Sequence, residues 1–285
     1  MHTKIFSGRR FVFWPLALVA LSVQAADRIE KVFTVSKNSN LMLMNYSGMV
    51  SVKGWQNSEI KAVWVKYSQN VEIDTESGGN KVRLATHVMD KLASPERAKV
   101  DYQILVPEDA GLQIQSNLGS VLIENVRGPV NVDVVDAPVR VIGTAGYVTA
   151  KSLCSRLEIS QSKGIIQTKT VSGDIVFSRL ESNNVTASST LGNIYYEGDF
   201  SRGGKYNFTT NEGFISINCP DQASVDWEAK TVKGAIESDL PIKSKAHRSV
   251  PRNSPERQSL VGTQNSGDAT VQLSTFSGTI KIRRK

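Results

Sequence analysis

A short glycine-centred phrase returns at a nearly constant spacing through most of this 285-residue chain. Its central positions are Gly48, Gly119, Ala137, Ser155, Gly173, Gly192, Gly213, Gly234 and Gly278. From position 119 to position 173 the copies are 18 residues apart, and the next steps are 19, 21 and 21 residues. A period near 20 residues is typical of an array in which each unit buries its apolar side against the next unit. The repeat therefore predicts a solenoid.

Each copy of the phrase predicts two β-strands that meet at the central position. Apolar and polar residues alternate after it, with Val121 and Ile123 apolar in one copy and Val139 and Val141 apolar in the next. Alternation with a period of two places one face of a strand inside and the other outside. Equivalent strands would pair in parallel, and parallel crossovers favour the right hand. We therefore expect an all-β fold: a right-handed, parallel β-helix-like β-solenoid with about 18–22 residues per rung.

The central position also predicts a sharp corner. Glycine adopts positive φ angles without steric cost, and we expect these glycines to use that freedom. A column of hydroxyl side chains lies three residues earlier, at Ser116, Ser152, Thr170, Ser189, Thr210, Thr231 and Thr275. Such hydroxyls can bond to backbone groups at a turn. We interpret the column as corner capping rather than as a functional row.

Two segments interrupt the repeat and set the expected domain organisation. Residues 55–111 contain longer strand-like stretches, which predict an antiparallel cap over the first rung. Residues 26–111 would then hold the first rung and the cap, and residues 112–285 would hold the solenoid. Residues 241–265 are polar, basic and proline-bearing, which indicates a surface loop. The step across this loop is 44 residues, or two copies of 22, so the loop would take the place of one rung.

Residues 1–25 have the composition of a secretory signal peptide. Lys4, Arg9 and Arg10 precede a short apolar run, and small residues precede the expected cleavage site. A membrane anchor is the alternative, which the short run and Pro15 disfavour. Removing the segment lowers the formal net charge from +7 to +4, because three cations and no carboxylates leave. We therefore expect an exported protein, either periplasmic, cell-surface or secreted, with no later transmembrane segment and no nucleic-acid partner.

The two cysteines are expected to be free thiols. Cys154 and Cys219 lie three copies apart, which corresponds to about 14 Å in a stack of parallel strands. A disulfide requires Cα atoms within about 7 Å. The repeat register therefore disfavours a disulfide, even in an exported chain.

No pattern typical of a catalytic, metal or cofactor site is present. His87 and His247 have no second His or Cys at metal-ligand spacing. Outward acids such as Glu158 and Glu237 have no acid at the same position of an adjacent copy, whereas glycoside hydrolysis needs two carboxyl groups within about 5–10 Å. We therefore expect a protein that is not an enzyme and that has no cofactor and no metal.

One outward row is continuous and uncharged. It occupies the second position of successive first strands and consists of Gln113, Asn131, Thr149, Gln167, Thr186 and Asn207. Amides and hydroxyls repeated along a stiff face could hydrogen-bond to a glycan or to a neighbouring surface. They could also form a solvated face that only supports the sheet. For this polar stripe we favour the solvated face and keep surface binding as the alternative.

Four stretches carry a resemblance to a known family: NYSGMVSVKGW (45–55), YQILVPEDAGLQIQSNLGSVLIENV (102–126), TVSGDIVF (170–177) and TFSGTIKI (275–282). With the signal peptide, they resemble the bacterial β-strand-repeat family labelled putative adhesin, a domain of unknown function. The resemblance spans about residues 40–285 and implies an exported scaffold without catalytic residues. The first hypothesis is a non-enzymatic adhesin that contacts an envelope component, a glycan or a protein. The alternatives are a polysaccharide-processing or carbohydrate-binding module, and a periplasmic sensory or regulatory domain that uses the loop at 241–265.

Overall fold

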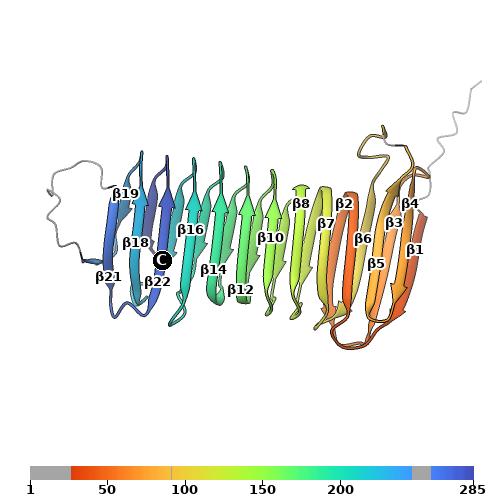
Figure 1. Ribbon diagram of the computed structural model, residues 1–285, viewed down its shortest axis with the longest axis horizontal. Helices are drawn as coiled ribbons and strands as arrows, with labels where there is room; N and C mark the ends of the chain where they lie inside the picture. The colour runs from red at the N-terminus through yellow and green to blue at the C-terminus, as the bar shows by residue number, and fades with distance from the viewer. Residues whose placement is uncertain (1–26, 91, 246–257) are drawn as a thin grey trace, which may run out of the picture.

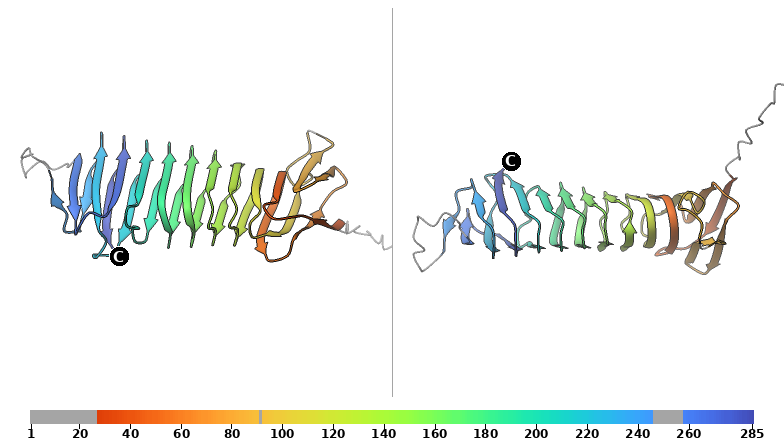
Figure 2. Two further views of the ribbon diagram at one scale, coloured as in Figure 1. Left: turned by 60° about the horizontal axis from the view of Figure 1, so that its bottom comes forward. Right: turned by 90° about the horizontal axis from the view of Figure 1, so that it is seen from above.

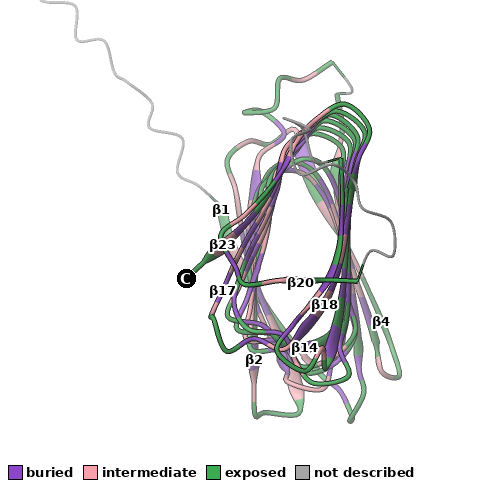
Figure 3. Ribbon diagram, turned by 90° about the vertical axis from the view of Figure 1, so that its left-hand side faces the viewer, coloured by how far each residue is buried: buried purple, intermediate pink, exposed green. Residues whose placement is uncertain are grey.

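The computed structural model describes residues 27–90, 92–245 and 258–285, and the predicted signal peptide lies outside them. The described chain is all β, with strands stacked along one axis as two facing walls (Figures 1 and 2). Seen along that axis, the walls enclose a narrow interior (Figure 3). Two long strands, β2 (Asn40–Trp55) and β7 (Gly111–Glu124), run through both walls and join them into one sheet. The predicted β-solenoid is therefore confirmed.

The order of strands in each wall follows from the backbone pairing. From the amino-terminal end, the first wall contains β4 (Val71–Gly78), β5 (Lys81–Val88), the first halves of β2 and β7, β8 (Val130–Asp136), β10 (Val148–Ser152), β12 (Lys163–Thr170), β14 (Glu181–Ser189), β16 (Lys205–Thr210), β22 (Ala269–Thr275), β18 (Val225–Thr231), β21 (Ser259–Gln264) and β20 (Lys243–Ser244). The second wall contains β1 (Asp27–Thr34), β3 (Glu59–Lys66), β6 (Val100–Pro107), the second halves of β2 and β7, β9 (Val139–Ile142), β11 (Leu157–Ser160), β13 (Ile175–Ser178), β15 (Ile194–Glu197), β17 (Ile215–Cys219), β23 (Ile280–Arg284) and β19 (Ile236–Ser238).

The core lies between the walls and consists of the apolar positions predicted from the alternation. In every copy, the residue seven positions before the central position is buried. These residues are Leu41, Leu112, Val130, Val148, Ile166, Val185, Tyr206, Trp227 and Val271. In the second wall, Val121, Val139, Leu157 and Ile175 are consecutive register partners and are at most 2% exposed. Each rung thus buries its apolar residues on the equivalent residues of its neighbours, which is the source of stability in a repeat array.

The corners confirm the hydroxyl caps but correct the role of most glycines. Thr170 Oγ1 accepts a hydrogen bond from the backbone N of Gly173 at 3.0 Å, and Ser189 Oγ accepts one from Gly192 at 2.8 Å. Only Gly48 and Gly119 among the repeat glycines have a positive φ. The other repeat glycines, such as Gly192, are required because there is no room for a side chain. A Cβ at these positions would lie 1.9 to 2.2 Å from a carbonyl oxygen of the adjacent rung. Close backbone approach, rather than an unusual φ, requires glycine there.

The amino-terminal end differs from the expected antiparallel cap. Strands β3 and β4 are antiparallel to their neighbours, as predicted, and so is β1. However, β5 and β6 pair in parallel with β2 and form a rung of their own outside it. Strand β2 lies between the rung of β5 and β6 and strand β7, so parallel pairing is continuous from this rung into the solenoid.

The carboxyl-terminal end departs from the order of the chain. The loop expected at 241–265 does not simply replace a rung: β21 pairs antiparallel with β18 and covers it. Strands β22 and β23 then return and lie between the rung of β16 and β17 and the rung of β18 and β19 (Figure 1). Residues 246–257, with His247, lie outside the described residues. The spacing of 44 residues could not show this order, because a strand pair with the repeat sequence can stack between any two rungs.

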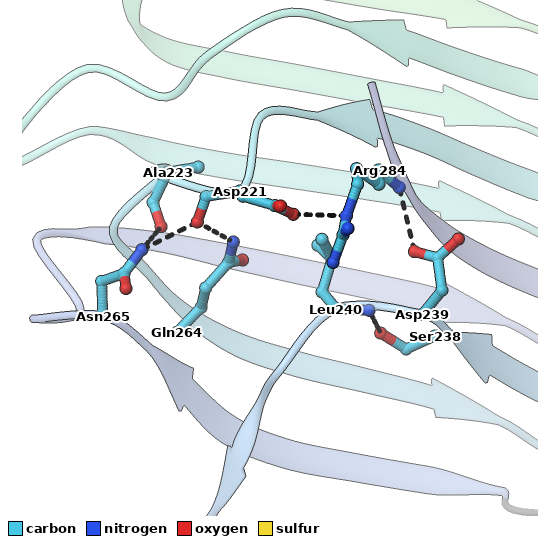
Figure 4. A network of polar contacts seen from close by, with 8 residues as sticks. All are labelled: Asp221, Ala223, Ser238, Asp239, Leu240, Gln264, Asn265 and Arg284. Carbon is cyan, nitrogen blue, oxygen red and sulfur yellow. Dashed lines mark hydrogen bonds and ion pairs between the residues drawn. The ribbon is translucent and has the colours of Figure 1, made fainter.

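Polar contacts hold the returning rung in place (Figure 4). Arg284 Nε lies 2.7 Å from Asp221 Oδ1, and the Arg284 backbone N donates to Asp239 Oδ1 at 2.9 Å. Gln264 accepts a hydrogen bond from Trp227 Nε1 at 3.1 Å and donates one to the carbonyl of Asp221 at 3.1 Å. The last strand is thus tied to the connections that precede β18 and follow β19.

Both cysteines are free, as predicted. Cys154 is exposed, whereas Cys219 is buried, and burial raises the pKa of its thiol to about 12. Within the ranges that the structure describes, no helix has the length and apolar character of a membrane span.

Candidate functional site: a groove on the first wall

The predicted polar stripe is a continuous row on the outer face of the first wall. Its members Gln113, Asn131, Thr149, Gln167, Thr186 and Asn207 are register partners from each strand to the next. All six side chains are exposed or half-buried. The same row continues to Met42 and Arg83 at the amino-terminal end. Ladder hydrogen bonds on both sides of the strands fix the spacing of the row at about 4.8 Å per rung.

Four stripe residues line a groove of about 1100 Å³: Gln113, Asn131, Thr149 and Gln167. Thr186 and Asn207 do not line it. The groove extends across β2, β7, β8 and β10 to the hairpin of β4 and β5, whose residues 76–78 and 81–83 form its other side. Figure 3 shows β4 standing outward from the wall. The stripe thus provides a floor, and the hairpin provides a raised border.

The row two residues before the stripe adds an aromatic ring to the groove. Gly111 and Pro129 line the groove in this row, followed by Tyr147. The Tyr147 hydroxyl donates a hydrogen bond to Gln167 Oε1 at 2.6 Å, which holds the ring against the next rung. A positioned aromatic face beside amides suits a ligand that has both apolar and polar surface.

The charged groups of the groove are mostly positive. Arg83 Nη1 lies 2.9 Å from Glu76 Oε1, so these two charges offset each other. Lys81 and Lys151 also line the groove and are exposed. Neither lysine has an ion pair with another residue of the described part of the chain. The groove therefore carries an excess of positive charge around a neutral floor.

The opposite end of the row has a different character. Gln272 donates a hydrogen bond to Glu228 Oε2 at 3.0 Å, and Lys230 donates to the same carboxylate. These hydrogen bonds lower the pKa of Glu228, with Lys230 as the larger cause. The polar groups at this end satisfy one another, whereas Lys81 and Lys151 in the groove have no ion-pair partner among the described residues. The groove is therefore the part of the stripe with capacity for a ligand.

Two outward acids of the second wall, Glu158 and Asp174, are engaged with other groups. Glu158 lies 3.3 Å from Arg140 and 3.9 Å from Arg156, in both cases between its Oε2 and a guanidinium nitrogen. Asp174 Oδ1 accepts hydrogen bonds from the backbone N and the side chain of Asn193. No group of three or more His, Cys, Asp or Glu side chains within the described ranges is placed to hold a metal ion.

Sequence reasoning found the floor of the groove but missed its border. Lys81 and Arg83 were not singled out, because β5 was expected in an antiparallel cap rather than in parallel register with β2. Tyr147 was missed because it lies two residues before the stripe position, outside the row that was compared. The alternation in the stretch NKVRLATHV matches the phrase LMLMNYSG of the first rung, and this match was the available signal.

A family model described as Toastrack DUF4097 matches residues 35–283 of the chain. No curated protein matches it. Similar solved structures include a putative adhesin from Bacteroides fragilis, at 13% identity over 91% of this chain and 97% of that one, with a TM-score of 0.43. Another is a putative adhesin from Parabacteroides distasonis, at 10% identity over 92% and 98%, with a TM-score of 0.39. A putative cell adhesion protein from Clostridium sporogenes has a TM-score of 0.29 at 13% identity over 91% and 100%. These superpositions are too loose to bear on function.

Proposed function

The chain belongs to the Toastrack DUF4097 family, and from this premise we propose that it is an exported, non-enzymatic scaffold that attaches to a cell-envelope component through the groove, as an adhesin does. The observation that carries the proposal is the groove of about 1100 Å³ with its preformed floor of amide and hydroxyl groups. Export is supported by the signal-peptide composition of residues 1–25.

The rigidity of the floor supports a binding role. Strands β7, β8 and β10 are paired on both sides, and each has buried apolar residues beneath it. Ligand binding therefore requires little ordering of the protein, which lowers the entropic cost of association. Glu158 and Asp174 of the second wall are engaged with other groups, which favours binding over hydrolysis by a pair of free carboxylates.

The test is co-sedimentation of the mature protein, residues 26–285, with envelope fractions of the native cell. We expect Asn131→Ala combined with Tyr147→Ala to weaken binding about tenfold, because both side chains line the groove. The matched control is Thr186→Ala combined with Asn207→Ala, which alters the same stripe outside the groove. The control should bind like the unaltered protein. Equal binding by both variants, or no binding by the unaltered protein, would overturn the proposal.

A further inference from the structure

The charges at the groove suggest which kind of envelope component it takes. Resting on the function proposed above, we infer that the ligand of the groove is an acidic polysaccharide, an extended glycan chain whose sugars carry carboxylate groups. The inference depends on three features: the position of the cations, the neutral floor between them, and the single aromatic ring.

The cations lie toward opposite ends of the groove. Lys81 belongs to β5, where Arg83 is already paired with Glu76, and Lys151 belongs to β10, with β2, β7 and β8 between the two lysines. Four strand spacings correspond to about 19 Å across the face. A single small anion cannot contact both ends at this distance. An extended ligand with repeated negative charges can.

Between the cations the floor is uncharged. Met42, Gln113 and Asn131 occupy the stripe row there. Amides donate and accept hydrogen bonds, as a row of sugar hydroxyls requires. The neighbours of Lys151 in register are Asp133 on one side and Lys169 on the other, so the local charge at that end remains positive. The pattern of positive ends around a neutral hydrogen-bonding floor is complementary to a polyhydroxylated chain with spaced carboxylates.

Two other kinds of polymer fit less well. Single-stranded nucleic acid needs a series of aromatic rings on which bases stack, and Tyr147 is the one aromatic side chain among the described residues that line the groove. A peptide that binds by strand addition needs an open sheet edge, whereas the floor strands β2, β7, β8 and β10 have strand partners on both sides. One ring beside amides is instead the arrangement that receives the apolar face of a sugar.

The experiment measures binding of the mature protein to polygalacturonate, to neutral dextran and to double-stranded DNA by titration calorimetry. We expect polygalacturonate to bind, with weaker binding as salt is added. Lys81→Gln combined with Lys151→Gln should weaken that binding about fivefold, since two exposed charge contacts are removed. The charge-matched control, Lys205→Gln combined with Lys243→Gln, alters exposed lysines outside the groove and should leave binding unchanged.

The outcomes separate this inference from the proposed function. If the groove variant with Asn131→Ala and Tyr147→Ala loses envelope binding, but dextran or DNA binds the protein as well as polygalacturonate does, the acidic-glycan inference is wrong and the envelope-binding function stands. Equal losses in the two lysine double variants would also overturn the inference, because the effect would then come from net charge alone. If the unaltered protein binds neither envelope fractions nor polygalacturonate, both proposals fail.

Discussion

At the residue scale, the corner glycines are explained by contact between neighbouring rungs. An added Cβ at Gly192 would lie 1.9 Å from the carbonyl oxygen of Gly173, and one at Gly213 would lie 2.2 Å from that of Gly192. Ala137 and Ser155 occupy the same central position in two other copies, so the corners of those copies have room for a Cβ. At Gly192 the contacting atoms belong to the backbone, and the backbone is held by the ladders on both sides. The requirement for glycine therefore comes from stacking, and each rung imposes it on the next.

We expect Gly192→Ala to lower the free energy of unfolding by about 1–3 kcal/mol, because the added methyl group overpacks a corner that cannot relax. The measurement is urea unfolding of the mature protein. Gly78→Ala is the matched control, since nothing lies within 4 Å of a Cβ at Gly78. That variant should change stability by less than about 0.5 kcal/mol. Equal destabilisation by the two substitutions would contradict the stacking explanation.

At the element scale, the returning strands β22 and β23 are the least expected part of the fold. Thr275 Oγ1 donates to the carbonyl of Gly213 at 3.2 Å, and Thr231 Oγ1 donates to that of Gly278 at 3.1 Å. These corner bonds follow the spatial order of the rungs rather than their order in the chain. The same hydroxyl and glycine pattern thus closes corners across 62 and 47 residues of sequence. Because the rungs have equivalent corners, β22 and β23 can stack between two rungs that precede them in the sequence.

Cysteine pairs test the rung order directly. Asn207 and Gln272 are register partners on adjacent strands, whereas β22 separates Asn207 from Glu228. In a Cys154→Ser background, we expect N207C/Q272C to form a disulfide on mild oxidation, because adjacent strands place the Cα atoms about 5 Å apart. We expect N207C/E228C not to form one, because two strand spacings exceed the reach of a disulfide. Non-reducing electrophoresis after proteolysis reads both outcomes. The reverse result would show that the rungs stack in chain order.

At the scale of the whole molecule, most rungs stack in the order of the chain, and this order changes near the two ends. Rungs from β7 to β17 contact their neighbours in the chain, so their stability is approximately a sum of nearest-neighbour terms. At the carboxyl-terminal end, the rung of β18 and β19 contacts the rest of the solenoid through β22 and β23. Its stability therefore depends on β21, β22 and β23, which follow it in the sequence.

Deleting residues 259–285 should unfold β18 and β19 while the rungs from β8 to β15 remain folded. The physical reason is that the deletion removes β21 and β22, the strands on both sides of β18, and β23, the partner of β19. Hydrogen exchange of the truncated mature protein measures this difference, because protection reports local opening. Retained protection in β18, or loss of protection throughout the solenoid, would contradict the nearest-neighbour description.

The sequence by itself determined the parts of this protein that depend on local pattern. Period-two alternation identified inward residues such as Val139 and Leu157, and the hydroxyls before each corner were identified because they act on nearby backbone. The polar stripe followed from the same alternation. Equivalent copies of one phrase, however, contain no information on which copies become neighbours. Only the tertiary structure decided that β5 pairs with β2, which borders the groove with Lys81 and Arg83, and that β22 lies between β16 and β18. Strand pairing joins residues distant in sequence, and in a repeat protein many such pairings satisfy the local pattern equally well, so packing of the complete chain selects among them.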